Sequence, residues 1–132
     1  MTVKNRFARL LAAKLLWRIA LAVSIAAIIY LATTSQNFPA AASFSDKFNH
    51  LIAFMELTIL ARLSWPHVRM LTSAGLLLGF GLLIELLQAP LPYREFSVLD
   101  LLADGIGIAL GLAISPWLQA LARQSPASHS VD

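Results

Sequence analysis

The chain contains four apolar runs, each close to the length of a membrane span, and these runs decide what it can fold into. At about 1.5 Å of rise per residue, helices of this length cross most of the ~30 Å hydrocarbon core of a bilayer. Because lipid offers no hydrogen bonds, a spanning segment must satisfy its own backbone groups, as a helix does. The sequence therefore predicts an all-α integral membrane protein with four transmembrane helices in a bundle, at Leu15–Thr33, Phe48–Leu63, Met70–Ala89 and Leu99–Leu118.

The composition leads to the same class of protein. Hydrophobic residues make up 58% of the chain and charged residues 13%, against about 25% charged in a typical soluble domain. A chain this apolar has too little polar surface to cover a core in water, so we expect lipid to cover it. The sequence contains no cysteine, which excludes disulfides and cysteine-ligated metal sites.

Basic residues set the expected orientation in the membrane. Five of the ten lie within residues 4–18, directly before an apolar run, and no acidic residue precedes Asp46. Such a block indicates membrane orientation rather than nucleic-acid binding. We expect residues 1–14 to be a basic amphipathic extension of the first helix at the cytoplasmic side. A signal peptide cleaved near Ala40 is a weaker alternative. The uncharged loop 34–45 then lies outside, and the polar tail 119–132 and both termini lie in the cytoplasm.

Polar residues gather at the span ends that this orientation places outside. Charges in such positions are expensive and are seldom left unpaired, so they are the first lead to function. Three helix ends and one loop contribute them: Asp46, Lys47 and His50 in the second span, Glu85 and Gln88 in the third, Arg94 and Ser97 in the loop, and Asp100 and Asp104 in the fourth. We therefore expect a single polar site at the outer face.

The helical repeat indicates which sides of the helices face one another. Asp100, Asp104, Gly107 and Gly111 are spaced four, three and four residues apart, so they form one narrow stripe. Gly81 lies on the same face as Glu85 and Gln88. Glycines on such a stripe let a second helix approach closely. We therefore expect Gly81, Gly107 and Gly111 to be structural packing positions beneath the carboxylates.

These residues occur in an order that is similar to a known family. The sequence contains Asp46-Lys47-x-x-His50-x-x-x-Phe54, then Gly79 and Glu85-x-x-Gln88, then Arg94-x-x-Ser97-x-x-Asp100-x-x-Ala103-Asp104-x-x-Gly107-x-x-x-Gly111. Over 46–111 it resembles the VanZ-like family of small bacterial membrane proteins, which places a VanZ-like domain at residues 15–118. The resemblance implies a multi-pass protein of the bacterial inner membrane. The founding member of the family is linked to resistance to the glycopeptide teicoplanin. The family usually has Asn where this chain has Asp104, so the site here is more acidic.

Convergence of charge and the resemblance together suggest a function. The leading hypothesis is that the outer site binds, and chemically modifies, an anionic lipid-linked or cell-envelope substrate such as a cell-wall precursor. The expected acid/base group, and so the candidate catalytic set, is His50, Glu85, Asp100 and Asp104. Lys47 and Arg94 would hold the anion, and the substrate-binding set is completed by Asp46, Gln88 and Ser97. Membrane lipids are the expected partners, and no nucleic acid is expected.

Simpler interpretations of the same residues stay open. Asp46 and Lys47 suit a helix end at the interface, Ser97 suits a helix cap, and Glu85 with Arg94 suits a structural ion pair. The protein would then be a non-catalytic assembly subunit whose Gly-xxx-Gly faces form a helix-mediated oligomer. A proton- or ion-coupled transporter is a further alternative, and it would need Glu56 to connect with the outer site.

No cofactor can be named from the sequence. His50, Glu85, Asp100 and Asp104 are ligand types that suit a divalent metal. However, the sequence holds no His-Glu-x-x-His or comparable short-range signature. The sequence alone therefore predicts no metal site.

Overall fold

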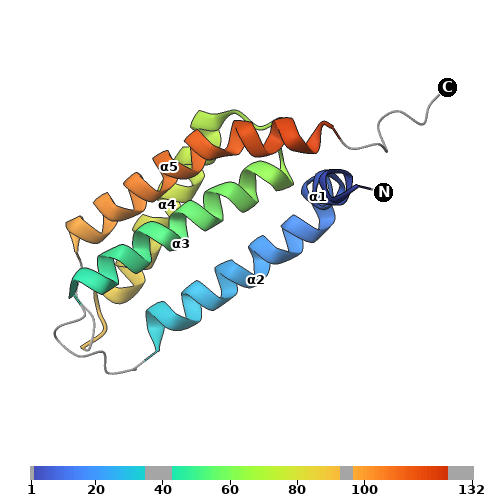
Figure 1. Cartoon of the computed structure of the whole chain (residues 1–132). Coiled ribbons are helices and arrows are strands. Elements are labelled where there is room, and N and C mark those ends of the chain that lie inside the picture. The colour runs from blue at the N-terminus through green and yellow to red at the C-terminus, as the bar shows by residue number, and fades with distance from the viewer. Residues whose placement is uncertain (1, 35–42, 93–96, 125–132) are drawn as a thin grey trace.

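The computed structural model describes residues 2–34, 43–92 and 97–124, with only the backbone of 43–46. Within these residues the fold is entirely helical, as the sequence predicts. The helices, in chain order, are α1 (Val3–Leu11), α2 (Lys14–Thr33), α3 (Ser43–Ser64), α4 (Met70–Gln88) and α5 (Val98–Ala122) (Figure 1).

Three of the helices, among the residues that are described, are long and apolar enough to cross a membrane: α2, α4 and α5. The fourth predicted span lies in α3, which is long enough but carries Lys47, Glu56 and Arg62. This helix packs along α5 and also contacts α2 and α4, and Leu57 and Thr58 at its middle are fully buried. Neighbouring helices thus shield Arg62, which is buried, and reduce the cost of its charge, whereas Glu56 is exposed. A fourth crossing stays a prediction.

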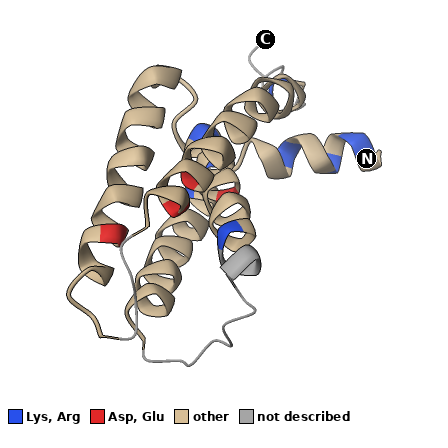
Figure 2. Cartoon of the chain, turned by 90° about the vertical axis from the view of Figure 1, so that its left-hand side faces the viewer, with Lys and Arg blue, Asp and Glu red and all other residues tan. Residues whose placement is uncertain are grey.

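The segment before the first span is a helix of its own rather than an extension of α2. It ends at Leu11, and the chain turns at Ala12 and Ala13 before α2 begins. The indole Nε1–H of Trp17 donates to the carbonyls of Leu10 (3.0 Å) and Leu11 (3.2 Å), which satisfies the last turn of α1. Figure 2 shows α1 leaving the bundle at a steep angle, with the basic residues along it. The basic amphipathic character predicted for this segment is therefore carried by a separate helix, which contacts α5.

The stripe of small residues on α5 faces α3, as its helical phase predicts. Asp100, Asp104, Gly107 and Gly111 are all buried. A Cβ atom at Gly111 would lie 2.6 Å from the Cβ of Thr58, and one at Gly107 would overlap the backbone carbonyl of Leu51. The two helices are therefore in backbone contact, and this contact brings the start of α5 next to the start of α3.

Different helix ends meet at the two ends of the bundle. At one end lie the end of α2, the start of α3, the end of α4 and the start of α5 (Figure 1). At the other end, Arg18 Nε donates to the carbonyl of Ser64 at 3.2 Å and its guanidinium lies 5.0 Å from the Trp65 ring centroid. There Gln119 Nε2 also donates to the carbonyl of Arg62 at 3.0 Å. These contacts join α2, α3 and α5 at the end where α1 lies.

The predicted orientation can be tested because the chain has no native cysteine. A membrane-impermeant thiol reagent should label Gln36→Cys in intact cells, because residue 36 belongs to the uncharged loop. His67→Cys lies between α3 and α4, beside Arg62 and Arg69, so it should react only after the membrane is permeabilised. The reverse pattern would contradict the predicted orientation.

Candidate functional site

A histidine and an aspartate from different helices form the centre of the candidate site. His50 on α3 and Asp104 on α5 are joined by a contact of 2.8 Å between Nδ1 and Oδ1. The side chain of Asp104 is 0% exposed and that of His50 is 13% exposed. A carboxylate oxygen can only accept, so the imidazole donates its Nδ1–H. The other ring nitrogen, Nε2, therefore carries a lone pair when the ring is neutral.

Asp100 lies beside that second nitrogen. Its Oδ2 atom is 3.8 Å from His50 Nε2, and its Oδ1 atom is 3.3 Å from the ammonium of Lys47 on α3. Lys47 is 36% exposed and Asp100 only 7%, so the lysine reaches inward from the rim. Asp100 also occupies the first turn of α5, where the helix dipole favours a negative charge. The Ser97 Oγ atom caps this turn by accepting from the Asp100 N–H at 3.3 Å.

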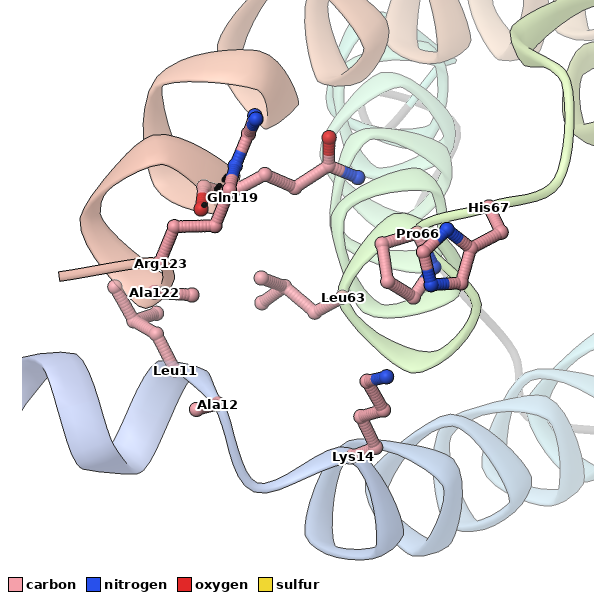
Figure 3. A pocket seen from close by; sticks show the side chains of 9 residues that line it. All are labelled: Leu11, Ala12, Lys14, Leu63, Pro66, His67, Gln119, Ala122 and Arg123. Carbon is pink, nitrogen blue, oxygen red and sulfur yellow. Dashed lines mark hydrogen bonds between the residues drawn. The ribbon is translucent and has the colours of Figure 1, made fainter. Parts of the chain in front are cut away.

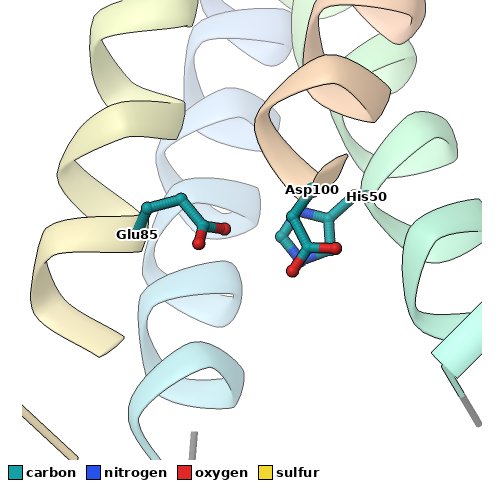
Figure 4. A group of neighbouring side chains, drawn as sticks. All are labelled: His50, Glu85 and Asp100. Carbon is teal, nitrogen blue, oxygen red and sulfur yellow. The ribbon is translucent and has the colours of Figure 1, made fainter. Parts of the chain in front are cut away.

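Glu85 brings a third helix to the site. It lies on α4, is 0% exposed, and accepts a hydrogen bond of 2.9 Å at Oε2 from the backbone N–H of Ser97. Its second oxygen, Oε1, is buried and has no hydrogen-bond partner among the described residues. Figure 4 shows the Glu85 carboxylate pointing from α4 toward Asp100 and His50. Each of these three residues offers one possible ligand atom, a ring nitrogen or a carboxylate oxygen, and the three atoms lie within 4.8 Å of one another.

An apolar layer closes the site on its inner side. Phe54, one helical turn below His50, is 1% exposed, and its ring centroid lies 6.0 Å from that of Phe80 on α4. Gly81 lies beside it, and a Cβ atom there would fall 2.7 Å from Asp104 Oδ2. The missing side chain of Gly81 is thus what leaves room for the Asp104 carboxylate.

The structure thus brings together most of the residues expected at the site. Lys47, His50, Glu85, Asp100 and Asp104 converge, and we call these five the end cluster. Ser97 contributes its backbone N–H and a helix cap. The importance of that backbone donor was not foreseen, because sequence patterns carry no signal for main-chain contacts between segments.

Three other expected residues are not part of the end cluster as described. Gln88 is buried, but its Nε2 donates to the carbonyl of Ala32 at 3.1 Å and so joins α4 to α2. Arg94 lies outside the described residues, and so does the side chain of Asp46. The predicted Glu85–Arg94 ion pair therefore stays a prediction.

Glu56 belongs to a different part of the bundle. It is exposed on α3, and its Oε1 accepts a hydrogen bond of 2.9 Å from Ser24 on α2. This contact points toward α2 and away from α5, which supplies Asp100 and Asp104. The transporter hypothesis requires a link between Glu56 and the end cluster, and the observed hydrogen bond does not provide one.

A cavity of about 340 Å³ lies at the opposite end of the bundle (Figure 3). Its lining includes the basic side chains Lys14, His67 and Arg123, and no acidic residue among those that the structure describes. None of the end-cluster residues lines it, so this basic cavity and the end cluster are separate features.

Comparison with known families shows which family model the chain matches. Residues 3–119 match the family model described as VanZ/LLP1. Neither the search of curated proteins nor the search of solved structures gave a match. The matched range covers α1 to α4, most of α5 and the whole end cluster, and it confirms the resemblance seen in the motifs. The chain belongs to the VanZ/LLP1 family.

Proposed function

We propose that the end cluster takes up the polar headgroup of an anionic, lipid-linked cell-envelope substrate at the surface of the bacterial inner membrane. The observation that supports this is the burial of three carboxylates beside a partly buried histidine, drawn from three helices, inside an otherwise apolar bundle. Burying charge costs several kcal/mol per ion, and apolar residues of similar volume usually stabilise a fold as well or better. A role beyond stability explains why such a costly cluster is there.

The cluster has a cation at its rim and acid/base groups behind it. Lys47 is the most exposed of the five residues, so its ammonium can meet an anionic headgroup first. Arg94, in the adjoining connection, is proposed to add a bidentate contact to phosphate. Behind Lys47, His50 is oriented by Asp104 in the way that a general base is oriented by a carboxylate. Modification of the substrate is part of this proposal, and resistance to teicoplanin is the phenotype that the family suggests.

Conservative changes in two carboxylates test this proposal. Glu85→Gln and Asp100→Asn should reduce glycopeptide tolerance of the host about tenfold or more, because each removes a carboxyl group that can give or take a proton in the site. The melting temperature of Glu85→Gln should stay equal or rise, since this carboxylate is buried and its Oε1 has no hydrogen-bond partner among the described residues. Glu56→Gln is the matched control, because it makes the same chemical change outside the end cluster.

A non-catalytic assembly role predicts a different result. It is favoured by the contacts that join helix ends, namely Lys47 to Asp100 and the Ser97 N–H to Glu85. Under this hypothesis, Glu85→Gln should lower the melting temperature by several degrees, as about 1 kcal/mol shifts it by roughly 3–6 °C at this size. If both variants keep full lipid binding and tolerance, the substrate-site proposal is wrong. Lipid analysis of a deletion strain against wild type would then show whether any envelope lipid depends on the protein.

A further inference from the structure

We propose that His50, Glu85 and Asp100 bind a divalent transition-metal ion such as Zn²⁺, with Asp104 orienting the histidine. One residue comes from each of three helices, α3, α4 and α5. The sequence alone predicts no metal site, because it holds no short-range signature. Such signatures depend on ligands that share one helix, whereas these ligands are up to 50 residues apart and meet only in the fold.

The distances within the group fit ligands of one ion better than a hydrogen-bonded network. Ligand atoms about 2.0–2.2 Å from a tetrahedral zinc lie roughly 3.3–3.6 Å from each other. His50 Nε2 and Asp100 Oδ2 are 3.8 Å apart, which is too long for a hydrogen bond, and the three ligand atoms lie within 4.8 Å of one another. Side-chain movements that close the largest of these separations, up to 4.8 Å, by roughly 1 Å would bring the three atoms around one ion.

An unsatisfied oxygen points to the same ligand independently. Glu85 is 0% exposed, and its Oε1 has no hydrogen-bond partner among the described residues. Figure 4 shows this carboxylate directed at His50 and Asp100. A buried oxygen without a hydrogen-bond partner destabilises the fold. A metal ion between the three side chains would satisfy it.

Asp104 performs the task that carboxylates perform behind many metal-bound histidines. Its Oδ1 lies 2.8 Å from His50 Nδ1, and therefore the Nε2 lone pair faces Asp100 and Glu85. Partners of this kind fix the ring and raise the basicity of the ligating nitrogen. The negative charge of Asp104 thus strengthens His50 as a metal ligand.

The charge of the cluster is also better suited to a cation than to a bare anion. Three carboxylates and one ammonium carry a formal charge of −2 when ionised, which one divalent ion would cancel. Lys47 competes with that ion, because its ammonium lies 3.3 Å from Asp100 Oδ1. It is also partly exposed and flexible, so it can withdraw toward the rim.

With three protein ligands, the ion keeps a position for another oxygen. Resting on the function proposed above, we infer that this position receives a phosphate oxygen of the substrate headgroup. The positive charge of the metal would then offset the carboxylates and attract the anionic phosphate. Binding of the ion itself does not depend on that function and can be measured without lipid.

The test uses the full-length protein in detergent micelles, purified without a histidine tag and titrated with Zn²⁺ alone by calorimetry. We expect one ion per chain, and Co²⁺ in its place should give the visible absorption of a tetrahedral site. His50→Ala and Glu85→Gln should weaken Zn²⁺ binding about tenfold or more. His67→Ala is the control, because it removes an exposed histidine at the opposite end and should change nothing. Glu85→Gln keeps the size of the side chain, so a folded variant is available even if His50→Ala fails to fold.

Lys47→Met adds a result of opposite sign. Removing the competing ammonium should tighten Zn²⁺ binding several-fold, although the same change should weaken binding of phosphate-bearing lipid. No Zn²⁺ binding, or equal binding in wild type and Glu85→Gln, would overturn the metal site. Lipid binding that persists in a chelator would then leave the proposed function standing. Zn²⁺ binding without any lipid binding would leave the metal site standing and contradict the proposed function.

Discussion

Replacing Gly107 with alanine should destabilise the protein by about 1–3 kcal/mol or more, whereas the same replacement at Gly105 should not. The added Cβ at Gly107 would overlap the carbonyl oxygen of Leu51 and lie 3.1 Å from both the carbonyl carbon of Leu51 and the amide nitrogen of Met55. These atoms belong to the backbone of α3. They cannot rotate away, so α3 and α5 would have to separate.

Gly105 provides a matched control on the same helix. A Cβ atom there would meet nothing within 4 Å, and alanine is favoured over glycine in a helix by about 0.5–1 kcal/mol. Thermal unfolding of both variants in the same detergent, followed by tryptophan fluorescence, measures the difference. Equal melting temperatures for the two variants would mean that α3 and α5 are not in backbone contact at this position. Because the end cluster is built across these two helices, Gly107→Ala should also weaken the site.

Replacing Gly81 with alanine should damage the site with much less effect on the bundle. The new Cβ would lie 2.7 Å from Asp104 Oδ2 and 3.3 Å from the Phe54 ring, so the Asp104 carboxylate would have to move. His50 would lose its orienting partner in its present geometry. Changes in such supporting groups typically reduce metal affinity or activity by about 10–100-fold, and we expect a loss of this size in Zn²⁺ affinity.

The control for this change is Gly79→Ala, two residues away on α4. A Cβ atom at Gly79 has nothing within 4 Å, so both Zn²⁺ affinity and melting temperature should stay close to wild type. Calorimetry with Zn²⁺ and thermal unfolding of the two variants give the comparison. A Gly81→Ala protein with unchanged affinity would show that the Asp104 carboxylate does not support the ligand set.

Most of the helical fold could be predicted from the sequence because apolar runs in lipid have few alternatives. The runs predicted at Leu15–Thr33 and Met70–Ala89 agree with α2 and α4 within one residue at each end. The prediction was weaker for α3, which begins at Ser43 rather than Phe48. Its first turn contains the polar residues Ser43, Ser45 and Asp46, and hydropathy alone does not assign such residues to a membrane-spanning helix.

The candidate site was predicted in part. The helical spacing of Asp100, Asp104, Gly107 and Gly111 placed them correctly on one buried face, because spacing within one helix follows from its geometry. The direction of Gln88 was not predictable in this way. Its partner is the carbonyl of Ala32, a main-chain atom of another helix, which no side-chain pattern reveals.

What the sequence by itself determined is the class of the protein, the position of its apolar helices and the candidate residues of the polar site. These follow from local rules, namely the cost of polar groups in lipid and the 3.6-residue repeat. Only the tertiary structure decided the pairing. In the fold, His50 contacts Asp104 and Lys47 contacts Asp100. The Glu85 carboxylate points toward both His50 and Asp100 (Figure 4). These contacts join residues far apart in the chain, and they depend on how closely α3 and α5 approach. The glycines of α5 permit that approach, but its consequences appear only when three helices are packed together.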